Sequence, residues 1–387
     1  MAMASRVEQL AEADRVAATG DIVAARALIE QLVVEDPSSG QLWLKLAALR
    51  RASGEPAKAL DAVHRALETA PLDFMALMMR AGLLERLGSD EAGLAWSRAL
   101  AQRPDGELPP PLAAAVAKGE QMRDAWLATR EVELRAATAE AEAKASEDEI
   151  ERIARFRNNA LRKTRAYHSE PTHFHFPGLV EREFHPRSAM PWLVEVEAAT
   201  ETFTAEFEAV MASERAELLP YIQYQDYEPL DQWRPLNHSR DWTAIHLLQN
   251  GRRIDANARH CPKTMALLAR LPQPDVPGAS PNAMFSLLAP QTHIPPHVGV
   301  SNARLVCHLP LIVPDGCWFR CGAETRQWRH GEAFCFDDTI EHEAANPSDA
   351  LRVVFIFDIW HPGLTPVERE AVKRLIAAEG HVAVGGL

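Results

Sequence analysis

The sequence has few cysteines, no excess of positive charge and no long hydrophobic run. Its five cysteines form an odd set without a Cys-x-x-Cys pair, which argues against a secreted disulfide framework. The N-terminal residues contain no apolar segment of the kind that secretory signal peptides carry. The longest apolar stretches, such as residues 353–359, are too short for a membrane span of roughly 20 residues. These absences predict a cytoplasmic protein that does not contact a membrane.

The charge balance excludes another class of partner. The 387 residues include 41 Lys and Arg against 54 Asp and Glu, which gives a formal charge of −13. No global positive field is therefore available to attract a nucleic-acid backbone, and we expect no nucleic-acid partner. The length admits two domains, each with its own core. Histidine is unevenly distributed, because only His64 of the 15 histidines precedes residue 166.

Residues 1–120 contain an internal repeat. Three glycines follow one another at intervals of 34 residues: Gly20, Gly54 and Gly88. Small residues recur in register after them, at Ala25, Ala59 and Gly93, and prolines recur at Pro37, Pro71 and Pro104. A period of 34 is typical of tetratricopeptide repeats, which are stacked pairs of helices with a concave surface. We expect that surface to receive a peptide or a partner protein; the alternative is that the repeats only brace the second domain.

The remainder of the chain divides into a connector and a second domain. Residues 121–166 are rich in Ala, Glu and Arg and contain no Pro or Gly, which predicts a long, solvated helical connector. Residues 167–387 contain short apolar runs between Pro, Gly and Asp turns, at 283–288, 304–313, 333–336 and 351–359. These runs predict a β-sandwich or jelly-roll domain with flanking helices near 192–212, 263–271 and 366–378. The predicted fold class is multidomain α plus β.

Two histidines and an arginine in the second domain form a candidate site. His297 precedes a predicted strand, His342 lies in a predicted turn between strands, and Arg352 lies inside the last apolar strand. A guanidinium in so apolar a strand is costly unless it meets a carboxylate. We interpret Arg352 as the bidentate partner of a dicarboxylate ligand, close to two imidazoles at the mouth of a barrel.

A resemblance to the aspartyl/asparaginyl β-hydroxylase family covers the segment HVGVSNARLVCHLPLIVPDGCWFRCGAETRQWRHGEAFCFDDTIEHEAANPSDALRVVFIFDIWHPGLTP. The upstream segments FPGLVEREFHPRSAMPWL, QNGRRIDANARHCPKT and FSLLAPQTHIPPH extend the resemblance over residues 176–365. That family comprises iron(II)- and 2-oxoglutarate-dependent oxygenases on a double-stranded β-helix. Its animal members also carry tetratricopeptide repeats before the oxygenase domain, so the two halves of this chain agree.

The resemblance assigns roles to individual residues. It implies that His297 and His342 bind iron(II), that Arg352 and Ser286 bind the distal carboxylate of 2-oxoglutarate, and that His308 holds its metal-chelating end. Many related oxygenases add a carboxylate ligand two residues after the first histidine. This chain has Gly299 there, a gap that the animal hydroxylases share. Asp337 and Asp338 are interpreted as turn and supporting residues.

A second departure concerns an arginine that the family commonly has two residues before the position of His308. This chain has Val306 there. Because Arg304 shares a strand face with Val306 and His308, we expect Arg304 to substitute in cosubstrate binding. Gln249, Arg252 and Arg253 are candidate substrate residues that would face an acidic side chain; a solvated surface turn is an equally good interpretation.

The implied function is that of a dioxygenase that uses O₂ and 2-oxoglutarate and releases succinate and CO₂. The expected reaction hydroxylates an unactivated carbon, first of all the β-carbon of Asp or Asn in a peptide or protein. One alternative is a small-molecule substrate. The other is a non-catalytic repeat scaffold whose degenerate barrel binds a partner protein. Joint retention of the five proposed site residues argues against such decay: Ser286, His297, His308, His342 and Arg352.

Overall fold

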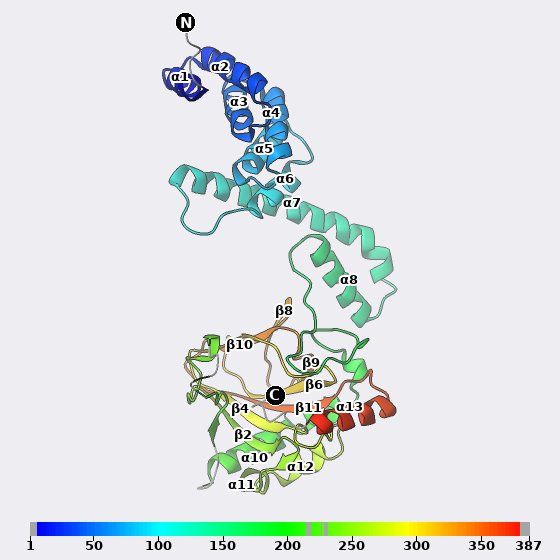
Figure 1. The fold of residues 1–387 in the computed structure, drawn as a ribbon. Coiled ribbons are helices and arrows are strands. Elements are labelled where there is room, and N and C mark those ends of the chain that lie inside the picture. The colour runs from blue at the N-terminus through cyan, green and yellow to red at the C-terminus, as the bar shows by residue number, and fades with distance from the viewer. Residues whose placement is uncertain (1–5, 214–217, 226, 228–230, 380–387) are drawn as a thin grey trace. The chain divides into compact units, whose positions relative to one another are not determined.

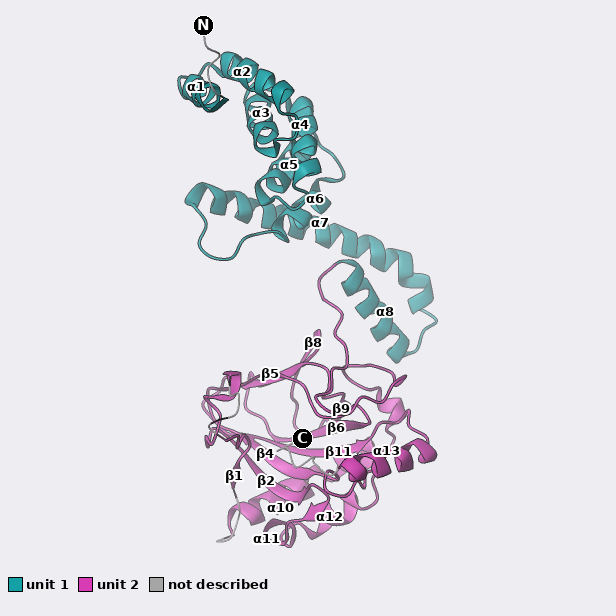
Figure 2. Ribbon diagram, viewed as in Figure 1, with its two compact units in different colours: residues 1–161 teal, residues 162–387 magenta. Residues whose placement is uncertain are grey.

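The structure is a computed structural model that describes residues 6–213, 218–225, 227 and 231–379. The chain forms two compact units, residues 1–161 and residues 162–387 (Figure 2). The first unit is helical and the second is built mainly of antiparallel strands (Figure 1). This is the predicted fold class. Within the described residues, no helix combines the length and the apolar character that a membrane span requires.

The first unit opens with three pairs of helices. They are α1 (Arg6–Ala18) with α2 (Ile22–Glu35), α3 (Gly40–Ala52) with α4 (Pro56–Thr69), and α5 (Phe74–Arg86) with α6 (Ala92–Leu100). The three periodic glycines all adopt positive φ in the turn inside each pair, a conformation that glycine reaches without steric cost. The periodic small residues let the helices approach closely: Ala25 and Ala59 are fully buried, and a Cβ on Gly93 would lie 2.1 Å from the Trp126 ring.

Two further helices complete this unit. Helix α7 spans Pro110–Glu142 and helix α8 spans Glu147–Ala160. The sequence predicted one continuous helix over this segment, and the structure divides it instead. The division has a local cause, because Ser146 and Glu149 form a capping box that starts a new helix. Arg157 of α8 then bonds Glu142 at the end of α7, at 2.6 Å.

The second unit contains two antiparallel sheets. The larger follows the order β1-β2-β4-β11-β6-β9, with β3 paired to β2. Its strands are β1 (Leu219–Pro220), β2 (Trp242–Gln249), β3 (Arg252–Arg253), β4 (Ala283–Leu288), β6 (Arg304–Ile312), β9 (Phe334–Phe336) and β11 (Arg352–Trp360). The smaller follows the order β5-β10-β7-β8. Its strands are β5 (Thr292–His297), β7 (Trp318–Cys321), β8 (Glu324–Gln327) and β10 (His342–Asn346).

The larger sheet is buried on both faces, which explains its uninterrupted apolar runs. Along β11, Val353, Phe355 and Phe357 join a core with flanking helices, whereas Val354 and Ile356 join the core between the sheets. The helices of this unit are α9 (Leu193–Ala198), α10 (Thr200–Met211), α11 (Asp255–Ala258), α12 (Pro262–Leu268) and α13 (Pro366–Glu379), with 3-10 turns at Arg187–Ala189 and Asp231–Trp233. By the period of two, Arg352 starts β11 on the face between the sheets.

Candidate active site

His297 and His342 meet across two neighbouring strands. His297 ends β5, His342 begins β10, and their Cα atoms are direct partners in the strand register. Their ring centroids are 4.0 Å apart. Nδ1 of His297 donates to the Pro295 carbonyl at 2.8 Å, and Nδ1 of His342 donates to the Ile340 carbonyl at 3.1 Å. Because a carbonyl only accepts, each ring carries its proton on Nδ1 and keeps the lone pair on Nε2 for a metal ion.

Burial keeps both imidazoles neutral. Burial, with a smaller contribution from the neighbouring His342, lowers the pKa of His297 to about 3. Burial also lowers the pKa of His342 to about 4, against the opposing effect of the Ile340 carbonyl. A metal ligand must offer an unprotonated nitrogen. The pair therefore meets that requirement throughout the neutral pH range.

The two histidines line a cavity together with Ser286, His308 and Arg352. Nη1 of Arg352 lies 3.4 Å from both the carbonyl oxygen and Oγ of Ser286. The indole of Trp242 donates to the same hydroxyl at 3.1 Å. Nδ1 of His308 and Nε of Arg352 are buried without a hydrogen-bond partner. The cavity thus offers polar groups that no protein group satisfies.

Arg352 is a buried cation without a compensating anion. Its exposed fraction is 1%, and among the described residues the ion pairs include no carboxylate partner for it. Burial lowers its pKa to about 9, so the guanidinium is still charged at neutral pH. It lies over the Trp328 ring, 4.6 Å from the centroid. A charge buried in this way is costly unless an anionic ligand completes the site.

Asp338 was interpreted from the sequence as a supporting turn residue, and the structure gives it a more direct place. Its exposed fraction is 2% and it lines the cavity with the histidines. A Cβ on Gly299 would lie 2.1 Å from Oδ2 of Asp338. The space that a side chain at residue 299 would need is therefore filled by the carboxylate of Asp338. The sequence analysis did not connect Asp338 with Gly299; the missing side chain at Gly299 is the signal from which this contact could have been inferred.

Arg304 is not brought to the cavity that holds Arg352. Its Nη2 donates to Oδ2 of Asp338 at 3.0 Å, and Val306 lines the cavity in the position next to His308 along the strand. The structure therefore gives Arg304 a buried carboxylate partner in place of the expected contact with a cosubstrate.

The three candidate substrate residues lie elsewhere. Gln249, Arg252 and Arg253 form the β2–β3 hairpin, where Gln249 and Arg252 are register partners. Both arginines are exposed, and Arg253 donates to Asp255 at 2.8 Å. None of the three lines the cavity with the histidines. Their geometry is that of a solvated surface turn.

Aromatic side chains close the cavity. Phe319, Trp328 and Phe336 line it, and the His308 ring lies 5.1 Å from Phe319 and 4.9 Å from Phe336 between centroids. An apolar wall of this kind limits water access and sets the dielectric around a metal site. Within the described part of the chain, no group of three or more His, Cys, Asp or Glu side chains has the geometry of a metal site.

Comparison with known proteins identifies a family match in this unit. Residues 197–362 match the aspartyl/asparaginyl beta-hydroxylase family. Human aspartyl/asparaginyl beta-hydroxylase is 38% identical over 142 residues, which is 36% of this chain and 18% of that protein. Human aspartate beta-hydroxylase domain-containing protein 2 is 32% identical over 212 residues, which is 54% of this chain and 55% of that protein. The chain thus spans less than two thirds of the length of these relatives.

Two solved structures have a likeness to part of this chain. The Yersinia enterocolitica type III secretion chaperone SycD, in complex with a peptide of the translocator YopD, covers 33% of this chain at 19% identity and a TM-score of 0.30, and 97% of that chain is covered. The first tetratricopeptide repeat domain of Spaghetti (RPAP3), bound to an HSP90 peptide, covers 30% at 16% identity and a TM-score of 0.27, and 92% of that chain is covered.

Proposed function

Because residues 197–362 form a domain of the aspartyl/asparaginyl β-hydroxylase family, we propose that this protein is an iron(II)- and 2-oxoglutarate-dependent oxygenase. Its reaction hydroxylates an unactivated carbon, in first place the β-carbon of Asp or Asn in a peptide or protein. Oxygen and 2-oxoglutarate are consumed, and succinate and CO₂ are released.

One observation carries this proposal. The unpaired cation of Arg352 and the two neutral imidazoles share one cavity. A buried guanidinium without a carboxylate favours an anionic ligand, and two neighbouring imidazole nitrogens with free lone pairs favour a transition metal. A ligand that chelates a metal at one end and carries a carboxylate at the other satisfies both at once. 2-Oxoglutarate has this chemistry.

Each cavity residue takes a role that its contacts support. The Nε2 atoms of His297 and His342 hold the metal, because their Nδ1 atoms are already engaged with backbone carbonyls. Arg352 and Ser286 bind the distal carboxylate, and His308 offers its unpartnered Nδ1 to the cosubstrate. The chemistry that iron(II) supplies when bound is the coupling of 2-oxoglutarate decarboxylation to oxygen transfer onto a carbon.

The surrounding residues prepare the site for that reaction. Phe319 and Phe336 exclude water from the space beside the histidine pair. Arg304 holds Asp338 by an ion pair at 3.0 Å, so the carboxylate keeps a defined position next to His297. The other carboxylate oxygen of Asp338, Oδ1, is buried and has no protein partner, and it orients a water molecule or a substrate N–H in the cavity.

Peptide hydroxylation is the direct test of the reaction. The full chain is incubated with iron(II), 2-oxoglutarate, oxygen and a library of Asp- and Asn-containing peptides, and products are read by mass spectrometry. We expect a peptide product heavier by one oxygen atom, labelled from ¹⁸O₂. Arg352→Met and His342→Ala abolish it. His293→Ala is the matched control, because His293 is half exposed and does not itself line the cavity; it bonds the cavity residue Glu343 at 2.8 Å.

The same assay separates the alternatives. Oxygen transfer to no peptide, together with turnover of a small molecule, would assign a small-molecule substrate. A chain that captures peptides through its helical repeats but leaves 2-oxoglutarate unconsumed would be a non-catalytic scaffold, and the oxygenase proposal would be wrong.

A further inference from the structure

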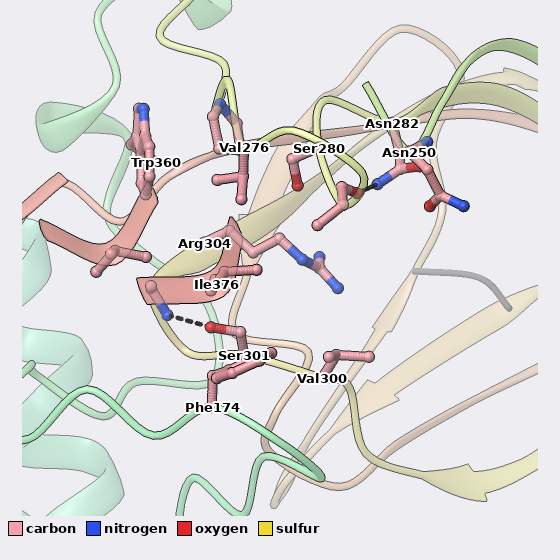
Figure 3. A pocket seen from close by; sticks show the side chains of 14 residues that line it. Phe174, Asn250, Val276, Ser280, Asn282, Val300, Ser301, Arg304, Trp360 and Ile376 are labelled. Atoms are coloured by element: carbon pink, nitrogen blue, oxygen red, sulfur yellow. Dashed lines mark hydrogen bonds between the residues drawn. The ribbon is translucent and has the colours of Figure 1, made fainter. Parts of the chain in front are cut away.

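A second cavity lies in the strand-rich unit beside Arg304 (Figure 3). We call it the Arg304 cavity. The larger side chains of its apolar wall are Phe174, Val276, Val300, Trp360, Val372 and Ile376. Val372 and Ile376 come from α13, so this helix forms one side of the cavity. The polar side chains Asn250, Ser280, Asn282 and Ser301 complete the lining.

Arg304 is the charged side chain of this lining. In Figure 3 the Arg304 side chain extends into the space between the side chains of Ser280 and Val300. Its exposed side-chain fraction is 9%. Nη2 donates to Asp338, but Nη1 is buried and has no hydrogen-bond partner. A buried N–H of a guanidinium without an acceptor destabilises the folded protein. Nη1 of Arg304 therefore lacks a hydrogen-bond acceptor, and a ligand in the cavity would supply one.

The nearby charges decide what kind of acceptor fits. Asp338 bonds Arg304 directly, and the fully buried Asp358 also acts electrostatically on it. Asp358 is itself held by the Asn282 backbone N–H at 2.8 Å and by the Ser280 hydroxyl at 3.0 Å. The single positive charge of Arg304 therefore offsets the negative charges of two carboxylates, Asp338 and Asp358. A third anion would be repelled by both, whereas a carbonyl oxygen accepts from Nη1 without adding charge.

We propose that the Arg304 cavity is a second ligand site, which takes a neutral molecule with a carbonyl or amide oxygen on an apolar body. The oxygen accepts from Nη1 of Arg304, and the apolar body packs against Val276, Trp360 and Ile376. The site is separate from the cavity of the histidine pair, and its existence does not depend on the proposed oxygenase activity.

Arg304 also connects this site to the histidine pair. The same guanidinium that faces the Arg304 cavity holds Asp338, which lines the cavity of His297 and His342. A carbonyl oxygen at Nη1 draws part of the guanidinium charge and weakens its hold on Asp338. The carboxylate then presents more negative charge to the histidine pair, and a divalent cation binds there more tightly.

The ligand class is tested with hexanamide on the metal-free full chain, by isothermal titration calorimetry and saturation-transfer NMR. We expect saturable binding of hexanamide, and binding of hexanoate that is weaker by about ten-fold because of the two carboxylates. Ile376→Trp fills the cavity and leaves residue Arg304 unchanged. Arg304→Lys keeps a cation beside Asp338 but removes the unpartnered Nη1 donor. Each variant weakens hexanamide binding by about ten-fold, as loss of contact or of one charged hydrogen bond requires.

Three outcomes would overturn the assignment. They are the absence of saturable hexanamide binding, unchanged binding in Ile376→Trp, and hexanoate binding as tight as that of hexanamide. Circular dichroism and thermal unfolding of each variant show that the fold is intact. Val276→Phe is a second cavity-filling variant, placed on the wall away from α13, for use if Ile376→Trp does not fold.

The connection to Asp338 has its own measurement. Mn²⁺ affinity is measured by electron paramagnetic resonance with and without hexanamide. This arm rests on the proposed metal site, and we expect Mn²⁺ to bind about fivefold more tightly in the presence of hexanamide, with no change in Ile376→Trp. An Mn²⁺ affinity that hexanamide leaves unchanged would contradict the connection. A chain that binds hexanamide but no Mn²⁺ would refute the proposed metal site and leave the Arg304 cavity as a ligand site.

Discussion

Replacing Arg352 by methionine is expected to stabilise the folded protein without ligand and to abolish the binding of 2-oxoglutarate. Arg352 is 1% exposed and has no carboxylate partner among the described residues. Its pKa is lowered to about 9 from the usual 12.5, and at about 1.4 kcal/mol per unit this corresponds to a cost of about 5 kcal/mol in the folded state. Methionine removes the charge and retains an apolar chain of similar length.

The stabilisation expected from Arg352→Met is smaller than that cost. The variant loses the cation–π contact with Trp328, about 2 kcal/mol in a desolvated site, and the contacts with Ser286, about 1 kcal/mol. We expect a net gain of about 2 kcal/mol in the free energy of unfolding without ligand. Because the folded-state pKa is depressed, the cost of the charge is fully present below about pH 9 and declines only as the pH rises above it. The gain is therefore constant between pH 6 and pH 8.

The assay is chemical denaturation of the full chain followed by tryptophan fluorescence, with and without 2-oxoglutarate and Mn²⁺. Ligand at 100 times its Kd stabilises the wild type by about 2.7 kcal/mol, and Arg352→Met shows no such response. Arg157→Met is the matched control, since Arg157 is also buried but bonds Glu142 at 2.6 Å; it lowers stability. If Arg352→Met is less stable than the wild type, or still responds to 2-oxoglutarate, the reasoning about Arg352 is wrong.

Three further predictions concern neighbouring residues. Stability of the metal-free protein falls as the pH drops below 6.5, because buried histidines with depressed pKa values, His297 among them, stay neutral in the folded state. The share of His297, whose pKa is about 3, is about 2 kcal/mol at pH 5; in urea titrations His297→Gln reduces the loss by that amount, and a loss equal to that of the wild type would contradict the assignment. Gly299→Ala lowers the free energy of unfolding by about 1–3 kcal/mol, because the added methyl group overpacks against Asp338. In calorimetry, the double variant Gly299→Ala/Asp338→Ala loses less stability than the sum of the two single variants; additive losses would contradict the contact. Arg304→Met leaves the Asp338 carboxylate unpaired and costs about 3–5 kcal/mol, whereas Arg304→Met/Asp338→Asn costs less; equal costs would show that the ion pair is not coupled.

Much of the architecture could be predicted from the sequence, because the spacing of small and apolar residues follows which positions are buried in the helix pairs and strands. The three glycines spaced by 34 residues predicted the helix pairs, and all three take the positive φ that makes their turns. The run over residues 283–288 coincides with β4, and that over residues 304–313 extends one residue beyond β6. The break between α7 and α8 was not predicted, because the helix-forming composition of that segment hides the short capping motif at Ser146.

The candidate site was predicted unevenly. His297 and His342 stand 45 positions apart in the sequence, and their partnership depends on the β5–β10 register, which composition does not reveal. Asp338 was undervalued for a related reason: a backbone hydrogen bond from Gly299 to the Asp338 carbonyl, at 2.6 Å, brings its carboxylate next to Gly299, and the sequence does not reveal this contact. The alternation of side chains along a strand correctly placed Arg304 on the same face as His308. It did not show that the Arg304 guanidinium forms an ion pair with the buried carboxylate of Asp338.

Succinate formation tests the central claim most directly. The full chain is loaded anaerobically with iron(II) and 2-oxoglutarate, exposed to oxygen, and assayed for succinate beside the His297→Ala/His342→Ala variant. We predict succinate from the wild type and from His293→Ala, and none above background from the double variant. Succinate from a folded wild type that does not exceed that of the double variant, with or without peptides, would contradict the oxygenase account.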